Sequence, residues 1–139
     1  ITRQRTIYSL KTVLPITIAL IIAAGLFLLL KKPRFSPTEG IGFYVFYILI
    51  SCPAQELLFR SILSRMLQEL RLHRALELGV AAALFGYAHI IYGDMLTVVV
   101  TSIVGLFWYR AYQRSSNLIG VTISHVVLGV MTIALGIID

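Results

Sequence analysis

Four ionisable side chains lie inside long apolar stretches of this sequence. Glu56 and Arg60 interrupt the apolar run 43–63, and His89 and His125 each lie in a further apolar run. On a helix, a spacing of four residues places Glu56 and Arg60 on one face, in the order that favours an ion pair. The pair alone could equally be a structural ion pair, in which the two charges neutralise each other, or part of a functional site. A carboxylate and two imidazoles in one small apolar protein predict a functional site.

Peptide-bond hydrolysis is one reaction that these groups could perform. It needs an activated water, a proton donor for the leaving amine and hydrogen-bond donors for the oxyanion. Glu56 would be the base, held by Arg60, with His89 as the acid or orienting group. His125 would donate a hydrogen bond to the oxyanion. Each histidine could instead bond to a local partner, but polar groups are costly inside a membrane, which favours a functional role.

Metal binding is the main alternative for the same residues. Glu56, His89 and His125 form a two-histidine, one-carboxylate set, which suffices for a catalytic zinc ion with an open coordination position. The sequence has no His-Glu-x-x-His motif, so this support is weak. A haem between the two histidines is a third hypothesis, although nothing in the sequence indicates a ring-sized cavity. A divalent metal such as zinc therefore remains an open prediction.

Five apolar helices would have to position these groups. The apolar runs predict membrane-spanning helices at about 7–30, 37–60, 75–91, 95–112 and 118–138. Pro53 predicts a kink just before Glu56. The stretch 64–77 alternates basic and apolar residues and is expected to lie on the membrane surface, with His73 exposed to solvent. The predicted fold is thus an all-α transmembrane bundle of about five helices with one interfacial stretch.

Composition agrees with a multi-pass integral membrane protein built as one domain, residues 1–139. The chain has 58% hydrophobic and 13% charged residues, and its mean hydropathy is +0.89. Its net charge is +6, but the basic residues lie at segment ends, where they bind lipid headgroups rather than nucleic acid. A single cysteine, Cys52, excludes an intrachain disulfide. The lipid bilayer is the partner that the composition predicts.

The basic residues also predict an orientation. With the N-terminus inside, eight of the twelve basic residues lie on the cytoplasmic-type side: Arg3, Arg5, Lys11, Arg65, Arg71, Arg74, Arg110 and Arg114. Three residues of the loop 31–40 fall on the opposite side. The first apolar run is longer than the core of a signal peptide and lacks a clear cleavage site, so we expect a retained membrane helix.

Three ordered motifs resemble those of the CAAX-protease and bacteriocin-processing (CPBP, or Abi) family. They are Gln-Glu-Leu-Leu-Phe-Arg at 55–60, Phe-Gly-Tyr-Ala-His at 85–89, and His125 four residues before Gly129. The usual forms in that family are Glu-Glu-x-x-x-Arg, Phe-x-x-x-His and His-x-x-x-Asn or Asp. The resemblance covers about residues 41–138.

This resemblance implies an intramembrane endopeptidase that hydrolyses peptide bonds in a membrane-associated peptide or protein substrate. It implies that Glu56, His89 and His125 are catalytic, that a divalent metal could take part, and that Arg60 and Phe85 support the site. Two positions depart from the pattern: Gln55 replaces the first glutamate, and Gly129 replaces the Asn or Asp. Glutamine cannot act as a general base, and glycine has no side-chain donor. The alternative is therefore a catalytically inactive subunit or assembly partner of a larger membrane protein complex.

Overall fold

The computed structural model describes residues 2–31 and 39–137, and these residues form five helical rods. The first rod is α1 (Arg3–Lys31). The second joins α2 (Ile41–Phe46), η1 (Tyr47–Ser51), α3 (Cys52–Glu56), η2 (Leu57–Ile62) and α4 (Leu63–Glu69). The third is α5 (Arg74–Tyr87) with the short 3₁₀ turn η3 (Ile90–Tyr92), and the fourth and fifth are α6 (Met95–Ser115) and α7 (Ile119–Ala134). The predicted all-α bundle is confirmed.

The outer surface of these rods is apolar. Four of them are long and apolar enough to cross a membrane, and α7 is a shorter apolar helix. Large apolar side chains are exposed on the outside, such as Ile22 (58%), Leu29 (78%) and Ile41 (85%). Apolar side chains exposed in this way are favourable in contact with lipid and unfavourable in contact with water. The chain is an integral membrane protein, as its composition predicts.

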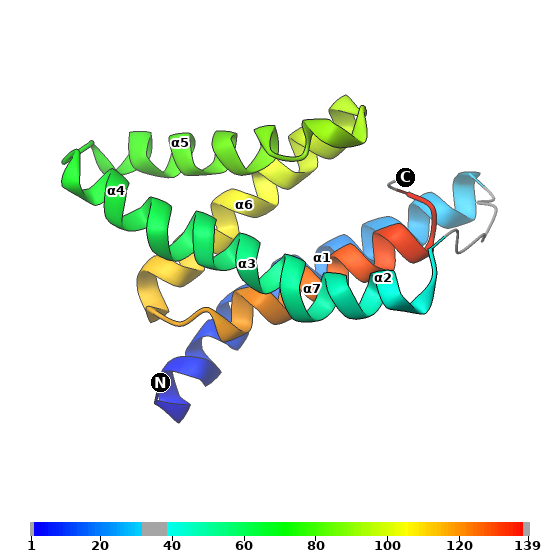
Figure 1. Cartoon of the computed structure of the whole chain (residues 1–139), viewed down its shortest axis with the longest axis horizontal. Coiled ribbons are helices and arrows are strands. Elements are labelled where there is room, and N and C mark those ends of the chain that lie inside the picture. Colours follow the sequence, from blue (N-terminus) through cyan, green and yellow to red (C-terminus); the bar gives the residue numbers. More distant parts are fainter. Residues whose placement is uncertain (1, 32–38, 138–139) are drawn as a thin grey trace.

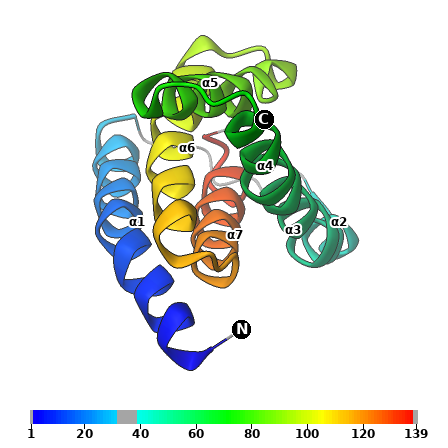
Figure 2. The same cartoon turned by 90° about the vertical axis from the view of Figure 1, so that its left-hand side faces the viewer.

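Helices α1, α6 and α7 run side by side, with α5 across one end and the second rod on the far side of α7 (Figures 1 and 2). Close approach between α1 and α7 depends on Gly120, because a Cβ there would overlap the Ser9 hydroxyl. Ser9 Oγ also donates to the Asn117 carbonyl over 3.2 Å. These contacts fix the position of α7 along α1, and with it the position of His125.

The second rod continues through Pro53 without a break. Pro53 lies in the first turn of α3, and π-helical turns lie on both sides of α3, in η1 and η2. Proline has no amide hydrogen to donate, and the backbone just before it adopts the wider π-helical turn. The predicted start of this helix at Pro37 lies outside the described residues. Tyr47 in η1, Glu56 in α3 and Arg60 in η2 are all buried.

The stretch 64–77, which we expect to lie on the membrane surface, is divided between two helices. Its first part ends α4, a turn follows in which Arg71 has a φ of 49°, and α5 begins at Arg74. Leu67 packs with Ala81 and Tyr109 in a buried cluster. Met66 and Leu70 of the same stretch are exposed, at 58% and 66%, so the bundle covers only part of its apolar surface. His73 is exposed, as predicted, and accepts a hydrogen bond from the Ala75 amide at the start of α5.

Candidate active site

Four predicted site residues come from three rods and meet in the core. Glu56 ends α3, Arg60 lies in η2, His89 follows α5, and His125 lies on α7. Glu56 and Arg60 are completely buried, His125 is 4% exposed and His89 is 9% exposed. An isolated buried charge would cost several kcal/mol, so the partners of these groups decide what they can do.

Glu56 uses both of its carboxylate oxygens. His125 Nδ1 donates to Oε1 over 2.8 Å, and Arg60 Nε lies 3.0 Å from Oε2. A carboxylate can only accept, so the Nδ1 atom of His125 carries a proton. In the neutral imidazole, Nε2 then holds the lone pair. Glu56 thereby fixes the tautomer of His125.

Arg60 is held by charge and by aromatic faces. Its Nε faces Glu56 at ion-pair distance but is not aligned for a hydrogen bond, and its Nη atoms have no hydrogen-bond partner among the described residues. The Cζ atom lies 4.3 Å from the centroid of the Phe85 ring and 5.8 Å from that of Trp108. A guanidinium over aromatic rings is stabilised by their negative faces. The predicted supporting residue Phe85 therefore contacts the ion pair directly.

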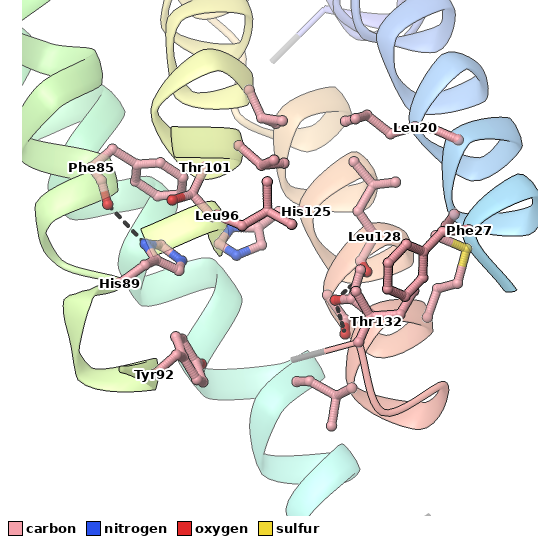
Figure 3. A pocket seen from close by; sticks show the side chains of 18 of the residues that line it. Leu20, Phe27, Phe85, His89, Tyr92, Leu96, Thr101, His125, Leu128 and Thr132 are labelled. Carbon is pink, nitrogen blue, oxygen red and sulfur yellow. Dashed lines mark hydrogen bonds between the residues drawn. The ribbon is translucent and has the colours of Figure 1, made fainter. Parts of the chain in front are cut away.

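His89 lies beside His125 at the same site. Its Nδ1 donates to the Phe85 carbonyl over 2.8 Å, which leaves Nε2 outside that bond. The centroids of the two imidazole rings are 6.5 Å apart. Figure 3 shows both rings at the wall of one cavity. Two imidazoles at this separation can act on one small molecule between them, one as a proton acceptor and the other as a donor.

Trp108 is a site residue that sequence reasoning missed. Its ring stacks on His125 at 4.8 Å, and its Nε1 donates to Ser124 Oγ over 2.9 Å. Ser124 is hydrogen bonded in turn to Thr17 Oγ1 of α1, 2.6 Å away. Nothing in the sequence distinguishes Trp108 from Phe107 and Tyr109 beside it. The structure places Trp108 in the buried core.

An apolar cavity of about 260 Å³ opens beside the two histidines (Figure 3). Tyr47 and Tyr92 line it together with His89 and His125. The remaining wall is mostly apolar and comes from α1, α6 and α7, including Leu20, Phe27, Val104, Leu128 and Met131. Neither Glu56 nor Gln55 is among the residues that line this cavity. An apolar chain could therefore reach the histidines, while the carboxylate stays behind them.

The two residues that depart from the motif pattern have different surroundings. Gln55 is half-buried, and its Nε2 donates to Ser51 Oγ one turn earlier over 3.0 Å. Gly129 lies directly against Tyr47, and a Cβ at this position would overlap the Tyr47 hydroxyl. Gln55 thus bonds within its own helical rod, whereas Gly129 makes room for another side chain.

The metal hypothesis finds little support in this geometry. In the part of the chain that the structure describes, no three His, Cys, Asp or Glu side chains are arranged to bind a metal ion. Glu56 and His125 are hydrogen bonded to each other, and the Nδ1 atom of His89 donates a hydrogen bond to the Phe85 carbonyl. As placed, the three predicted donors do not fit one ion.

Comparison with known protein families identifies the family of this chain. The sequence model of the type II CAAX prenyl endopeptidase Rce1-like family matches residues 36–131, which is more than half of the chain. The matched range contains Glu56, Arg60, His89 and His125, but excludes α1. Neither the curated proteins nor the solved structures gave a significant match.

Proposed function

Because the chain belongs to the type II CAAX prenyl endopeptidase Rce1-like family, we propose that it is a membrane-embedded endopeptidase. It would hydrolyse a peptide bond in a membrane-associated substrate. The observation that carries this proposal is the buried contact between Glu56 and His125 beside a cavity that reaches His125 and His89.

In this proposal His125 activates the water. Glu56 holds the proton on Nδ1, so Nε2 is free to accept a proton from water. Glu56 would also stabilise the imidazolium that forms, as carboxylates do in other carboxylate–histidine pairs. Arg60 keeps Glu56 ionised and in place. Glu56 therefore acts through His125 and has no need to reach the water itself.

His89 would complete the reaction from the other side. Once protonated, its Nε2 can donate to the leaving amine, while the Phe85 carbonyl keeps Nδ1 protonated and the ring oriented. The apolar cavity would bind the lipid-like part of the substrate and keep bulk water out. The name of the family refers to prenylated CAAX substrates, and a prenyl chain suits such a cavity. We therefore propose a prenylated peptide as the substrate class.

The test is peptide cleavage by the purified chain in lipid nanodiscs, with a farnesylated CAAX peptide as the probe. We expect His125→Ala and His89→Ala each to lower kcat at least about 100-fold, as loss of a general acid or base does. His73→Asn is the matched control, because His73 is exposed outside the site and asparagine preserves the helix cap. A well-folded wild-type chain that cleaves no peptide would overturn the proposal.

A second candidate function, an inactive subunit of a membrane complex, has its own support. Both oxygens of Glu56 are already engaged, and Gln55 and Gly129 lack groups that the motifs usually carry. If this candidate is right, the chain should copurify with another membrane protein. That partner should remain bound in the His125→Ala variant. Recovery of the chain by itself from its native membrane would count against this candidate.

A further inference from the structure

Tyr47 occupies the space that Gly129 leaves empty. A Cβ built on Gly129 would overlap Tyr47 Oη and come within 2.7 Å of Cζ and 2.8 Å of Cε1. The phenol of Tyr47 therefore lies where the side chain of residue 129 would begin. The sequence motif suggested that a donor was missing here, and the structure places a different residue at that position.

The same phenol borders the catalytic histidine. The Tyr47 and His125 rings meet edge to face, with centroids 6.3 Å apart, and both residues line the apolar cavity. Stacking on Phe43, at 6.0 Å and 17°, fixes the plane of the Tyr47 ring. Tyr47 is 7% exposed, so its ring is immobilised by packing. A rigid donor is the kind of group that stabilises a transition state without reorganising.

The neighbours of Tyr47 leave its hydroxyl hydrogen available. Its polar neighbours on the second rod include the thiol of Cys52, which is fully buried. A thiol is a weak acceptor and cannot compete with an anionic oxygen for this hydrogen. Charge on a peptide carbonyl oxygen that develops in the cavity would therefore attract the phenol.

We propose that Tyr47 donates a hydrogen bond to the oxyanion, from the position where Gly129 has no side chain. This role rests on the proposed endopeptidase function. In the step concerned, the oxygen of the water bonds to the peptide carbonyl carbon, the proton of the water passes to His125 Nε2, and the carbonyl π electrons move onto the oxygen that Tyr47 contacts. Collapse of this intermediate breaks the C–N bond, and a protonated His89 gives its Nε2 proton to the amine. The proton held by His125 Nε2 then passes to His89 Nε2, which returns both imidazoles to their starting states.

The test removes the hydroxyl alone. In the same cleavage assay, Tyr47→Phe should lower kcat about 100-fold, the size expected for one oxyanion donor. KM should change by less than about threefold, because the bond forms only as charge develops. Tyr44→Phe is the matched control: its hydroxyl is buried and has no partner among the described residues, and Tyr44 does not line the cavity. Its kcat should equal that of the wild type.

A donor-exchange pair covers the case in which Tyr47→Phe fails to fold. Tyr47→Ala makes room for a side chain at position 129, so Tyr47→Ala/Gly129→Asn and Tyr47→Ala/Gly129→Leu differ mainly in a donor. The asparagine variant should be at least about tenfold faster, since it restores one hydrogen bond of this kind. Equal rates in this pair, or a wild-type kcat in Tyr47→Phe, would overturn the role of Tyr47 while the endopeptidase function stands. An inactive wild type would overturn both.

Discussion

Glu56 and Glu77 are both buried in the bundle, but their hydrogen-bond partners differ in kind. Glu77, in the first turn of α5, accepts 2.7 Å hydrogen bonds from Tyr109 Oη and Gln113 Nε2 of α6. Glu56, in the centre of the second rod, contacts a guanidinium and an imidazole. Neutral donors can satisfy a carboxylate and join two helices. They cannot take up a proton near neutral pH.

The difference separates a structural carboxylate from one that can serve chemistry. Glu77 stabilises the pairing of α5 with α6 at the end of the bundle where α5 begins. Glu56 fixes the tautomer of an imidazole at a cavity wall, and that imidazole can exchange protons. Burial alone therefore does not mark a catalytic carboxylate. The deciding feature is a titratable partner with access to substrate.

The largest effect is expected from Glu56→Gln. Cleavage should fall at least about 100-fold because the tautomer of His125 is no longer enforced. Stability should also fall, by about 3–5 kcal/mol, because Arg60 becomes a buried charge without a counterion. Thermal unfolding in detergent and the peptide assay measure the two losses separately.

The double variant Glu56→Gln/Arg60→Met separates chemistry from stability. Removing the guanidinium should restore most of the unfolding temperature, because no uncompensated charge remains. Activity should stay at the level of the single variant. Recovery of cleavage in the double variant would mean that Glu56 contributes only to folding, as we infer for Glu77.

A smaller effect is expected from Gly105→Ala, which changes the α5–α6 pairing near the site. A Cβ on Gly105 would lie 2.8 Å from Phe85 Cδ1 and 3.2 Å from Phe85 Cβ. The ring must shift, and with it the contact to Arg60 and the backbone that holds His89. We expect a loss of about 1–3 kcal/mol from overpacking, together with a lower kcat.

Gly79→Ala provides the matched control near Glu77. Nothing lies within 4 Å of a Cβ at Gly79, so the same change there should leave cleavage unchanged and stability equal or slightly higher. If Gly105→Ala and Gly79→Ala changed kcat equally, the end of α5 near Phe85 and the end near Glu77 would not differ in their importance for cleavage.

Glu77→Leu tests the structural side of the comparison. It leaves Tyr109 Oη and Gln113 Nε2 without their acceptor, which should cost about 1–3 kcal/mol of unfolding free energy. The kcat of the folded protein should stay within about twofold of the wild-type value, because Glu77 lies outside the described cavity lining. A loss of kcat as large as that in Glu56→Gln would break the distinction.

The smallest effect is expected at the exposed Asp94, the cap of α6. Thr97 Oγ1 donates to its carboxylate over 2.7 Å, as do the amides of Thr97 (2.8 Å) and Leu96 (3.1 Å). These bonds lower the pKa of the Asp94 carboxyl below its usual range. Its contribution to stability is therefore present above the unfolded-state pKa of about 3.9 and is lost as pH falls through the folded-state pKa.

Asp94→Asn keeps an acceptor but removes the charge. The wild type should unfold at a slightly higher temperature than this variant at pH 7, and the difference should shrink progressively as the pH falls below about 4. A pH-independent difference would show that geometry, and not charge, makes aspartate the better cap.

Apolar run length is sufficient to predict the five rods, and the cost of polar groups in lipid is sufficient to select Glu56, His89 and His125. The sequence does not give the rotation of each helix about its axis. In a membrane helix both the lipid side and the protein side are apolar, so periodicity does not reveal that Tyr47 and Trp108 face His125. The same ambiguity applies to 64–77, where Leu67 packs in a buried cluster whereas Met66 and Leu70 are exposed.

The spacing of the ion pair also has a consequence for biosynthesis. Glu56 and Arg60 are four residues apart on one rod, whereas the Glu56–His125 contact spans 69 residues. The carboxylate and guanidinium therefore leave the ribosome together and can enter the bilayer already neutralised. His125 reaches them only after α5 and α6 have been inserted. We expect the nascent chain to insert its carboxylate already paired with Arg60, and the proposed endopeptidase site to be complete only once α7 is in place.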